Sequence, residues 1–264
     1  MGTNQTGKRF YQVKVKSPDT TSIKELGRLM EPLQMQAFRK TYGKILELTI
    51  AEDVLSGERK PYLSSGCLPS LSRIATVVKD SARGLDRIKQ TRNGIAGLPQ
   101  RYLEDKARGM ANQGDWVPFM DVLALLIFGV VLFPNVDGLV DLAAIDAFLA
   151  YHHSKESPVV AVLADLLDTF DRRCEKSSAR IICCLPALCN RLGPALGRIG
   201  GRTISWFPRW KEGKEGVLFS CGGYPNIPLV GTRGCINYNP ALAIRQLGYP
   251  MRGAPTEESM SPIL

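Results

Sequence analysis

The stretch Val122-Leu-Ala-Leu-Leu-Ile-Phe-Gly-Val-Val-Leu-Phe133, followed by Pro134, is the longest apolar run in the chain and decides its fold. It lies between Asp115 and Asp171, a region with nine acidic residues and one basic residue. A membrane-spanning helix needs about 20 apolar residues, whereas runs of about 10 to 14 are typical of buried core helices. The run is therefore too short for a clean span and predicts a central core helix. A membrane segment over 119–133 is the alternative.

Two amphipathic patterns follow the central run. Leucine, isoleucine, valine and phenylalanine recur at helical spacing over 139–152 and again over 158–173. An apolar helix followed closely by amphipathic helices is how a helical core is assembled. We therefore expect packed core helices near 119–133, 139–152 and 158–173.

The aspartates of these two patterns are assigned to solvent. Asp141 and Asp146 are placed on the outward side of the second helix. In the third, Asp165, Asp168 and Asp171 recur every three residues opposite the apolar face. A solvated polar stripe is favoured over a metal-binding acidic motif.

Shorter signals complete the expected fold. Ser22-Ile-Lys-Glu25 fits a capping box at the start of a helix. Gly94 to Pro99 is interpreted as a turn before a helix that runs to about Met110, and 228–230 as a short strand. The fold class is mainly α with a small β contribution, comprising a compact helical core and an irregular Gly/Pro-rich C-terminal part. We expect a single domain over 1–252, with its helical core at about 70–190, and a loose tail over 253–264.

Composition limits the chemistry that the chain can carry. The net charge of +9 makes anionic partners plausible, because charge governs association rather than fold. Seven cysteines without a secretory signal predict thiols in a reducing compartment. Cys183 and Cys184 lie in an apolar run and are expected to pack in the core rather than bind zinc. We predict no metal site and no cofactor.

The chain has two histidines, His152 and His153, at the end of the second amphipathic pattern. We expect one or both to face solvent rather than to catalyse a reaction, and we predict that the protein is not an enzyme. An enzyme with an unrecognised site stays open as an alternative, which a cleft with either histidine within reach of a buried aspartate would favour.

Nucleic-acid binding is a second alternative, carried by cations around aromatic rings. Cations can follow a phosphate backbone while the rings stack on bases. Core aromatic residues beside solvated cations are the simpler interpretation. The candidate residues are Arg198, Arg202, Trp206, Arg209, Trp210, Lys211 and Lys214.

Several motifs resemble the plant mobile domain family, and within it a legume branch of transposable-element-associated proteins. The resemblance covers most of the chain, and its most specific part is the closing motif. The motifs are Pro32-Leu-Gln-Met-Gln-Ala-Phe-Arg-Lys-Thr-Tyr-Gly-Lys-Ile-Leu46, Leu126-Ile-Phe-Gly-Val-Val-Leu-Phe-Pro134, Ser157-Pro-Val-Val-Ala-Val-Leu-Ala164, Gly231-Thr-Arg-Gly-Cys-Ile-Asn-Tyr-Asn-Pro240 and Arg245-Gln-Leu-Gly-Tyr-Pro250.

The resemblance implies a non-enzymatic interaction module of mobile-element origin with an as yet unknown protein partner, and it implies no catalytic residues. It also implies an intracellular and nuclear location. Membrane association through 119–133 or through myristoylation of Gly2 is the alternative. Two family segments look lost, at about 51–60 and after Leu188, so 51–66 and 189–203 are expected to be irregular.

Overall fold

A computed structural model describes the part of the chain that carries most of the predicted core. The described residues are 18–43, 45–46, 60–64, 67–175, 182–184, 220–221, 224–225 and 227–238. Gly2, most of the two segments expected to be irregular, the proposed domain boundary at 252 and the tail over 253–264 lie outside them. Expectations for those residues stay predictions.

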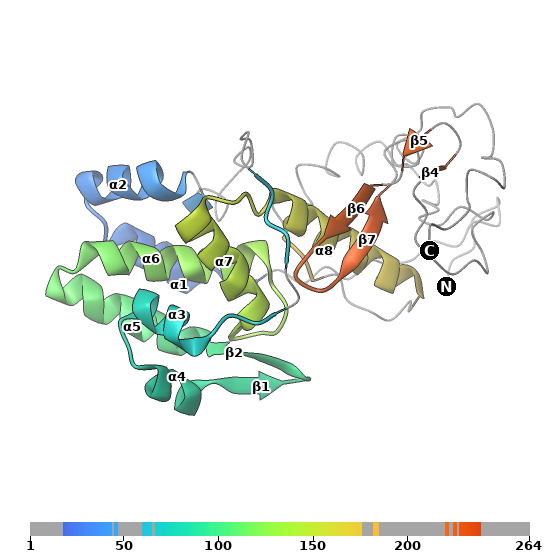
Figure 1. Cartoon of the computed structure of the whole chain (residues 1–264). Helices are drawn as coiled ribbons and strands as arrows, with labels where there is room; N and C mark the ends of the chain where they lie inside the picture. The colour runs from blue at the N-terminus through green and yellow to red at the C-terminus, as the bar shows by residue number, and fades with distance from the viewer. Residues whose placement is uncertain are drawn as a thin grey trace, which may run out of the picture.

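The described elements are mainly helical, as the sequence predicts, with short antiparallel strands (Figure 1). The helices are α1 Thr21–Arg28, α2 Pro32–Tyr42, α3 Leu71–Val78, α4 Ala82–Ile88, α5 Gln100–Gln113, α6 Trp116–Ile127, the π-helical segment η2 Phe128–Leu132, α7 Leu142–Ser154 and α8 Val159–Glu175. The strands are β1 Gln90–Arg92, β2 Ile95–Pro99, β3 Leu139–Asp141, β4 Ser220–Cys221, β5 Tyr224–Pro225, β6 Ile227–Val230 and β7 Cys235–Tyr238.

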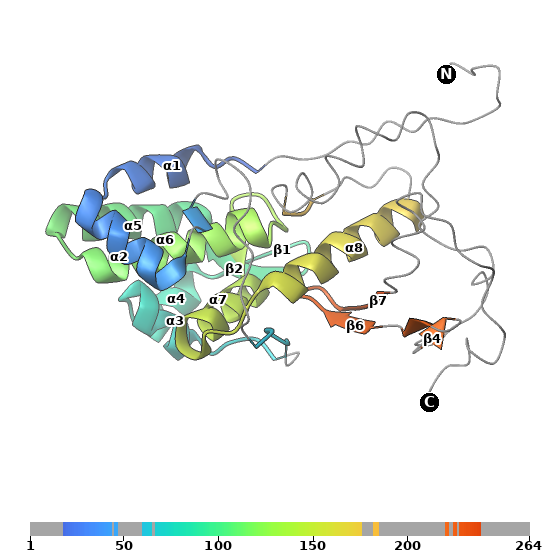
Figure 2. The ribbon, with the colours of Figure 1, turned by 90° about the horizontal axis from the view of Figure 1, so that it is seen from above.

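The long apolar run forms α6 and η2 and is the centre of the core. Every residue from Val122 to Pro134 is buried. Helix α6 contacts α1, α2, α3, α5 and α7, and Figures 1 and 2 show it lying among these helices. Among the described residues, no helix is long and apolar enough to cross a membrane. The prediction of a central core helix is confirmed.

A close approach between η2 and strand β3 explains a glycine inside the apolar run. A Cβ atom on Gly129 would lie 2.3 Å from Val140 Cγ1. Gly97 on β2 faces the same residue, because its Cβ would lie 2.4 Å from the backbone oxygen of Val140. The π-helical turn and the small sheet can therefore pack closely only if both positions lack a side chain.

The expected turn at Gly94–Pro99 is wrong for most of its length. Asn93 and Gly94 have φ angles of 53° and 78° and connect β1 to β2 as a two-residue hairpin. Asn-Gly is the preferred sequence for such a turn, and Ile95–Pro99 forms the second strand. This strand also pairs with β3, which gives a sheet of order β1-β2-β3. The Asn93-Gly94 pair is therefore a local hairpin signal, one residue before the expected turn.

The expected capping box at Ser22–Glu25 is also wrong. Ser22 Oγ donates a hydrogen bond to Glu104 Oε1 of α5, and Glu25 pairs with Arg108 at 3.3 Å. Helix α1 begins after Thr20 without a side-chain cap. Both side chains therefore connect α1 to α5. Their bonds to this neighbouring helix replace the hydrogen bonds that a capping box would make to the backbone of α1.

Part of the segment expected to be irregular is tied to the core. Tyr62 is buried, its backbone N donates to Ser157 O at 2.9 Å, and its hydroxyl donates to Asp146 Oδ2 at 2.8 Å. Residues 60–62 therefore run beside the start of α8 as a short bridge rather than as a loose loop.

Helix α8 extends beyond the helical layer, and the β6–β7 hairpin lies beside it in both views (Figures 1 and 2). Strand β6 includes residues 228–230, so the short strand predicted there is confirmed. Val230 pairs with Cys235 at the closed end of the hairpin, and residues 231–234 form its turn. This turn belongs to the closing motif of the family resemblance.

Candidate functional site

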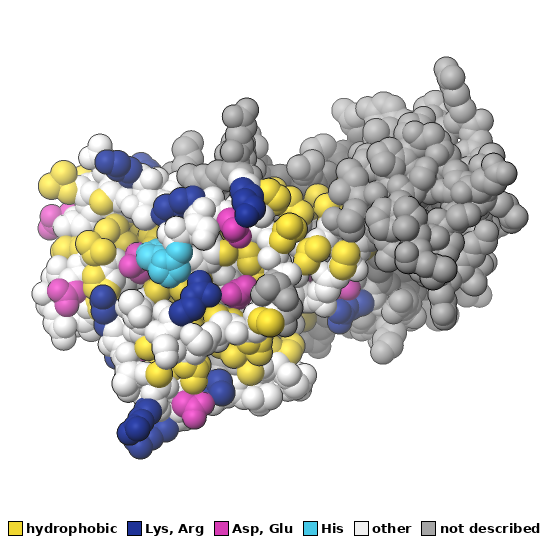
Figure 3. Space-filling view, viewed as in Figure 1, with side chains coloured by type: hydrophobic (Ala, Val, Ile, Leu, Met, Phe, Trp, Pro, Cys, Tyr) yellow, Lys and Arg dark blue, Asp and Glu magenta, His cyan; other side chains and the backbone are white. Residues whose placement is uncertain are grey.

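The two histidines lie where three helices meet. His152 is in the last turn of α7, and its Nε2 is 3.5 Å from Asp121 Oδ1 on α6. The hydroxyl of Tyr42, the last residue of α2, donates to the same carboxylate oxygen. His153 is exposed, as the sequence predicts, whereas the side chain of His152 is only 25% exposed. Figure 3 shows the histidines at the surface beside acidic and basic side chains.

Aromatic packing fixes the orientation of the His152 ring. The ring centroid of Phe148 lies 5.6 Å from that of His152, and the Tyr42 ring is stacked on His152 at 6.3 Å. The Tyr42 ring also stacks on Tyr151 at 6.2 Å. These rings belong to the buried core or its edge, so the core itself holds the imidazole toward Asp121.

The ionisation of the cluster follows from its contacts. Burial raises the pKa of Asp121, but the hydrogen bonds from His152 and Tyr42 outweigh burial and bring this pKa below its usual value. Burial, together with Asp121, raises the pKa of the Tyr42 phenol well above its usual range. Burial and the charges of His152 and Arg73 lower the pKa of His153. At neutral pH, Asp121 is ionised, Tyr42 is protonated and His153 is neutral.

The cluster positions an imidazole, and both of its ring nitrogens have partners within the protein. His152 Nε2 faces Asp121, and His152 Nδ1 lies 3.4 Å from His153 Nδ1. An enzyme that used His152 would need an aspartate beside one ring nitrogen and a substrate beside the other. Asp121 provides the first contact, but the second nitrogen of His152 faces His153.

A second cluster joins the C-terminal hairpin to α8. Asp165 accepts hydrogen bonds from the Thr232 hydroxyl and from the backbone N of Arg233. The Arg233 guanidinium donates to Thr169 Oγ1 at 3.1 Å, to Ile182 O at 3.2 Å and to Pro134 O. The hairpin turn is thus bonded to α8, to the loop after η2 and to residues 182–184.

The assignment of Asp141 and Asp165 to solvent is wrong. Asp165 is 3% exposed, and Asp141 is 4% exposed. Asp141 caps α7 by accepting from the backbone N of Ala144 at 2.6 Å, and it also accepts from Asn135 at 2.9 Å. Burial raises the pKa of Asp165, although its bonds to Thr232 and Arg233 oppose this. Each carboxylate is buried because hydrogen bonds satisfy it, from nearby residues for Asp141 and from the distant Thr232 and Arg233 for Asp165, and helical spacing reveals neither set.

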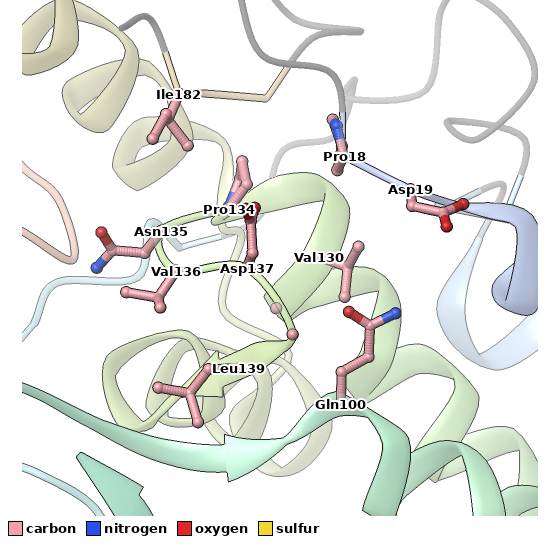
Figure 4. Close-up of a pocket in the computed structure, with 12 residues that line it drawn as sticks. Pro18, Asp19, Gln100, Val130, Pro134, Asn135, Val136, Asp137, Leu139 and Ile182 are labelled. Atoms are coloured by element: carbon pink, nitrogen blue, oxygen red, sulfur yellow. The ribbon is translucent and has the colours of Figure 1, made fainter. Parts of the chain in front are cut away.

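A small pocket lies at the junction of α5, η2 and the loop after it. Its volume is about 230 Å³, and its lining includes Asp19, Gln100, Asn135 and Ile182 (Figure 4). Ligand pockets usually have volumes of about 300 to 1,000 Å³. The side-chain amide of Asn135 donates a hydrogen bond to Asp141, the residue that caps α7, so this lining residue has a structural role. The described residues that line the pocket include no histidine, cysteine, serine or lysine.

The remaining sequence-predicted residues divide into two groups. Cys183 and Cys184 are buried, as predicted. Within the described ranges, no group of three or more histidines, cysteines, aspartates or glutamates is placed to hold a metal ion. All seven candidate nucleic-acid residues, from Arg198 to Lys214, lie outside the described residues and stay a prediction.

Comparison with known proteins gives one family match. A family model described as a domain of unknown function, DUF7745, matches residues 49–196 and 189–264. No curated protein and no solved structure matches the chain. The two matched ranges overlap at residues 189–196. Together they include the His152 cluster and the Arg233 cluster, except for Tyr42, which precedes the first range.

Proposed function

Because the chain belongs to the DUF7745 family, a domain of unknown function, we propose a function from the surface of the structure. The protein is a non-enzymatic interaction module that binds another protein through an apolar surface at one end of its helical layer. We further propose a mobile-element origin, as in the plant mobile domain proteins and their legume branch, and a nuclear location. The support for the origin is the set of motifs quoted above.

Three large apolar side chains carry the proposal of a contact surface. Leu29 is 46% exposed, Leu33 is 76% exposed and Val117 is 67% exposed. Leu29 follows α1, Leu33 is the second residue of α2, and Val117 is the second residue of α6. Figures 1 and 2 place the end of α1 and the starts of α2 and α6 at the same end of the layer.

The setting of these side chains is typical of an interaction site. Single exposed leucines are normal, but apolar side chains gathered at one end and rimmed by charges mark a contact surface. The charged residues Arg28, Glu31 and Asp115 are exposed beside them in the chain. Figure 3 shows hydrophobic side chains at this end of the molecule. The proposed occupant is an apolar surface of another protein, and proteins of mobile-element origin are the first candidates.

Site-specific photo-crosslinking in cells tests the contact surface. A photo-reactive residue at position 33 or 117 is expected to give the same protein adduct. The matched control is position 83, where Arg83 is exposed on α4, a helix at another edge of the molecule (Figure 1). Adding Leu33→Ser to a chain crosslinked from position 117 should reduce the adduct about tenfold, because burying a leucine side chain contributes about 1.5 to 3 kcal/mol and about 1.4 kcal/mol corresponds to tenfold in affinity. Equal adducts at 33, 83 and 117 would rule the surface out.

Loss of two family segments is a separate proposal. The family match divides at residues 189–196, inside the segment where the sequence departs from the resemblance. The other departure, at about 51–60, lies within the first matched range. Because the family model matches as two separate ranges that meet there, the match supports a loss of residues near position 190 relative to the family.

Nucleic-acid binding is the second candidate, supported by the mixture of cations with Trp206 and Trp210. The expected result is binding of single-stranded DNA that weakens steeply between about 50 and 200 mM salt, because phosphate contacts release counterions. Replacing Arg202, Arg209 and Lys211 by alanine should abolish most of it. The control replaces Arg83, Arg87 and Arg101, which are exposed elsewhere on the chain. Absence of binding at low salt would eliminate this candidate.

A further inference from the structure

Adjacent histidines at the end of α7 bring two ring nitrogens together. His152 Nδ1 and His153 Nδ1 are 3.4 Å apart, and their rings are nearly perpendicular, with an interplanar angle of 88°. The two nitrogens can share a hydrogen bond when one ring donates to the other. The separation also matches that of two nitrogens bound to one tetrahedral metal ion. With metal–nitrogen bonds of about 2.05 Å, it gives a nitrogen–metal–nitrogen angle of roughly 110°.

Asp121 prepares His152 to act as a ligand through Nδ1. Because the carboxylate faces Nε2 at 3.5 Å, it favours the tautomer with the proton on Nε2. The lone pair of a neutral His152 is then on Nδ1, toward His153. Metal-binding histidines commonly donate their other N–H to a carboxylate in this way. Tyr42 in turn holds the carboxylate by donating its hydroxyl hydrogen.

We propose that His152 Nδ1 and His153 Nδ1 form a two-ligand surface site for a borderline divalent metal ion such as Zn²⁺. Imidazole nitrogen suits this class of ion, which also includes Cu²⁺ and Ni²⁺. Asp121 is a positioning residue that acts through His152. Water or a ligand from a second molecule completes the coordination. This site is independent of the apolar contact surface proposed above.

The surrounding charges limit the affinity of the site. Lys155 follows α7, and Arg73 on α3 is close enough to lower the pKa of His153. Both cations oppose binding of a metal ion, whereas the ionised Asp121 favours it. The site should therefore bind Zn²⁺ reversibly rather than tightly.

Imidazole nitrogen NMR tests the proposal directly, because His152 and His153 are the chain's two histidines. The full chain, without a histidine tag, is titrated with Zn²⁺ at pH 7. The Nδ1 signals of both rings are expected to shift together along one binding curve. Zinc bound by cysteines would leave them unmoved and would count against the site. No shift, a shift of one ring only, or a shift at Nε2 would also overturn it.

Variants separate a metal site from a merely structural contact. Asp121→Asn should weaken Zn²⁺ binding about 10- to 100-fold, as losses of such supporting carboxylates do. Asp146→Asn is the matched control, because Asp146 is a half-buried carboxylate on α7 that accepts a hydrogen bond from Tyr62. It should leave the Zn²⁺ curve unchanged. His153→Ala should abolish the His152 shift, which keeps the proposal testable if Asp121→Asn fails to fold. Unchanged affinity in His153→Ala would overturn it.

Discussion

Arg233→Met is expected to lower the free energy of unfolding by about 3 kcal/mol, because it removes one partner of a largely buried charged network. The guanidinium bonds to Thr169 and to the carbonyl oxygens of Pro134 and Ile182. Methionine keeps the length of the side chain but removes the hydrogen bonds to these acceptors and leaves Asp165 without a nearby positive charge. Ile182 O and the Thr169 hydroxyl remain bonded to each other, so Pro134 O loses most. Urea unfolding monitored by circular dichroism measures the change.

The matched control is Arg172→Met on the same helix that carries Asp165. Arg172 pairs with Asp168 at 2.8 Å, but its side chain is 57% exposed. Exposed pairs of this spacing contribute only about 0.3 to 0.5 kcal/mol. Equal losses in Arg172→Met and Arg233→Met would show that the hairpin turn is not held by this network.

The pH dependence of the same network has a definite sign. Burial raises the pKa of Asp165 above its unfolded value, so the folded state binds the proton more tightly. The contribution of this carboxyl to stability is full below its unfolded pKa of about 3.9 and declines as the pH rises through its folded pKa. Asp165→Asn cannot ionise and should lack this decline. A wild-type chain whose stability has no Asp165-dependent slope above about pH 4 would contradict the burial.

Gly129→Ala is expected to destabilise the core by about 2 to 3 kcal/mol through overpacking. The new Cβ would lie 2.3 Å from Val140 Cγ1 and 2.9 Å from Val140 Cβ, so either η2 or β3 must shift. Both elements are buried and well packed, which makes a shift costly. The melting temperature and the urea midpoint should both fall.

A double-mutant cycle with Val140→Ala checks the cause. Val140→Ala alone removes two methyl groups and leaves a small cavity, so it also destabilises. In Gly129→Ala/Val140→Ala the two changes compensate, and the loss should be smaller than the sum of the single losses. Gly109→Ala is the control, since no atom lies within 4 Å of a Cβ built there. Additive losses would mean that Val140 is not the obstacle.

The candidate clusters could be found only in part from sequence. His152 and His153 were identifiable as the two imidazoles of the chain, and the closing motif contains Thr232 and Arg233. Their partners were not. Tyr42 lies 79 residues from Asp121, and Arg233 lies 68 residues from Asp165. Neither composition nor local spacing predicts which distant helices will meet.

The sequence by itself determined the helical core. A short, almost uninterrupted apolar run must be buried, and the apolar periodicities after it must pack against it, because the hydrophobic effect is non-directional and grows with the apolar area removed from water. The mainly α fold and the buried Cys183 and Cys184 follow from that. The Asn93-Gly94 hairpin was also encoded locally, in the preference of those residues for positive φ.

Only the tertiary structure decided where the polar groups are. By sequence alone, Ser22 and Glu25 could cap α1, and the spacing of Asp165 would place it on the solvent-facing side of its helix. Each instead bonds to a residue far along the chain. A polar side chain can be satisfied by water or by any correctly placed partner, so its position depends on which surfaces pack together. Apolar burial has no such alternative, and this is why the core could be predicted from the sequence and the polar clusters could not.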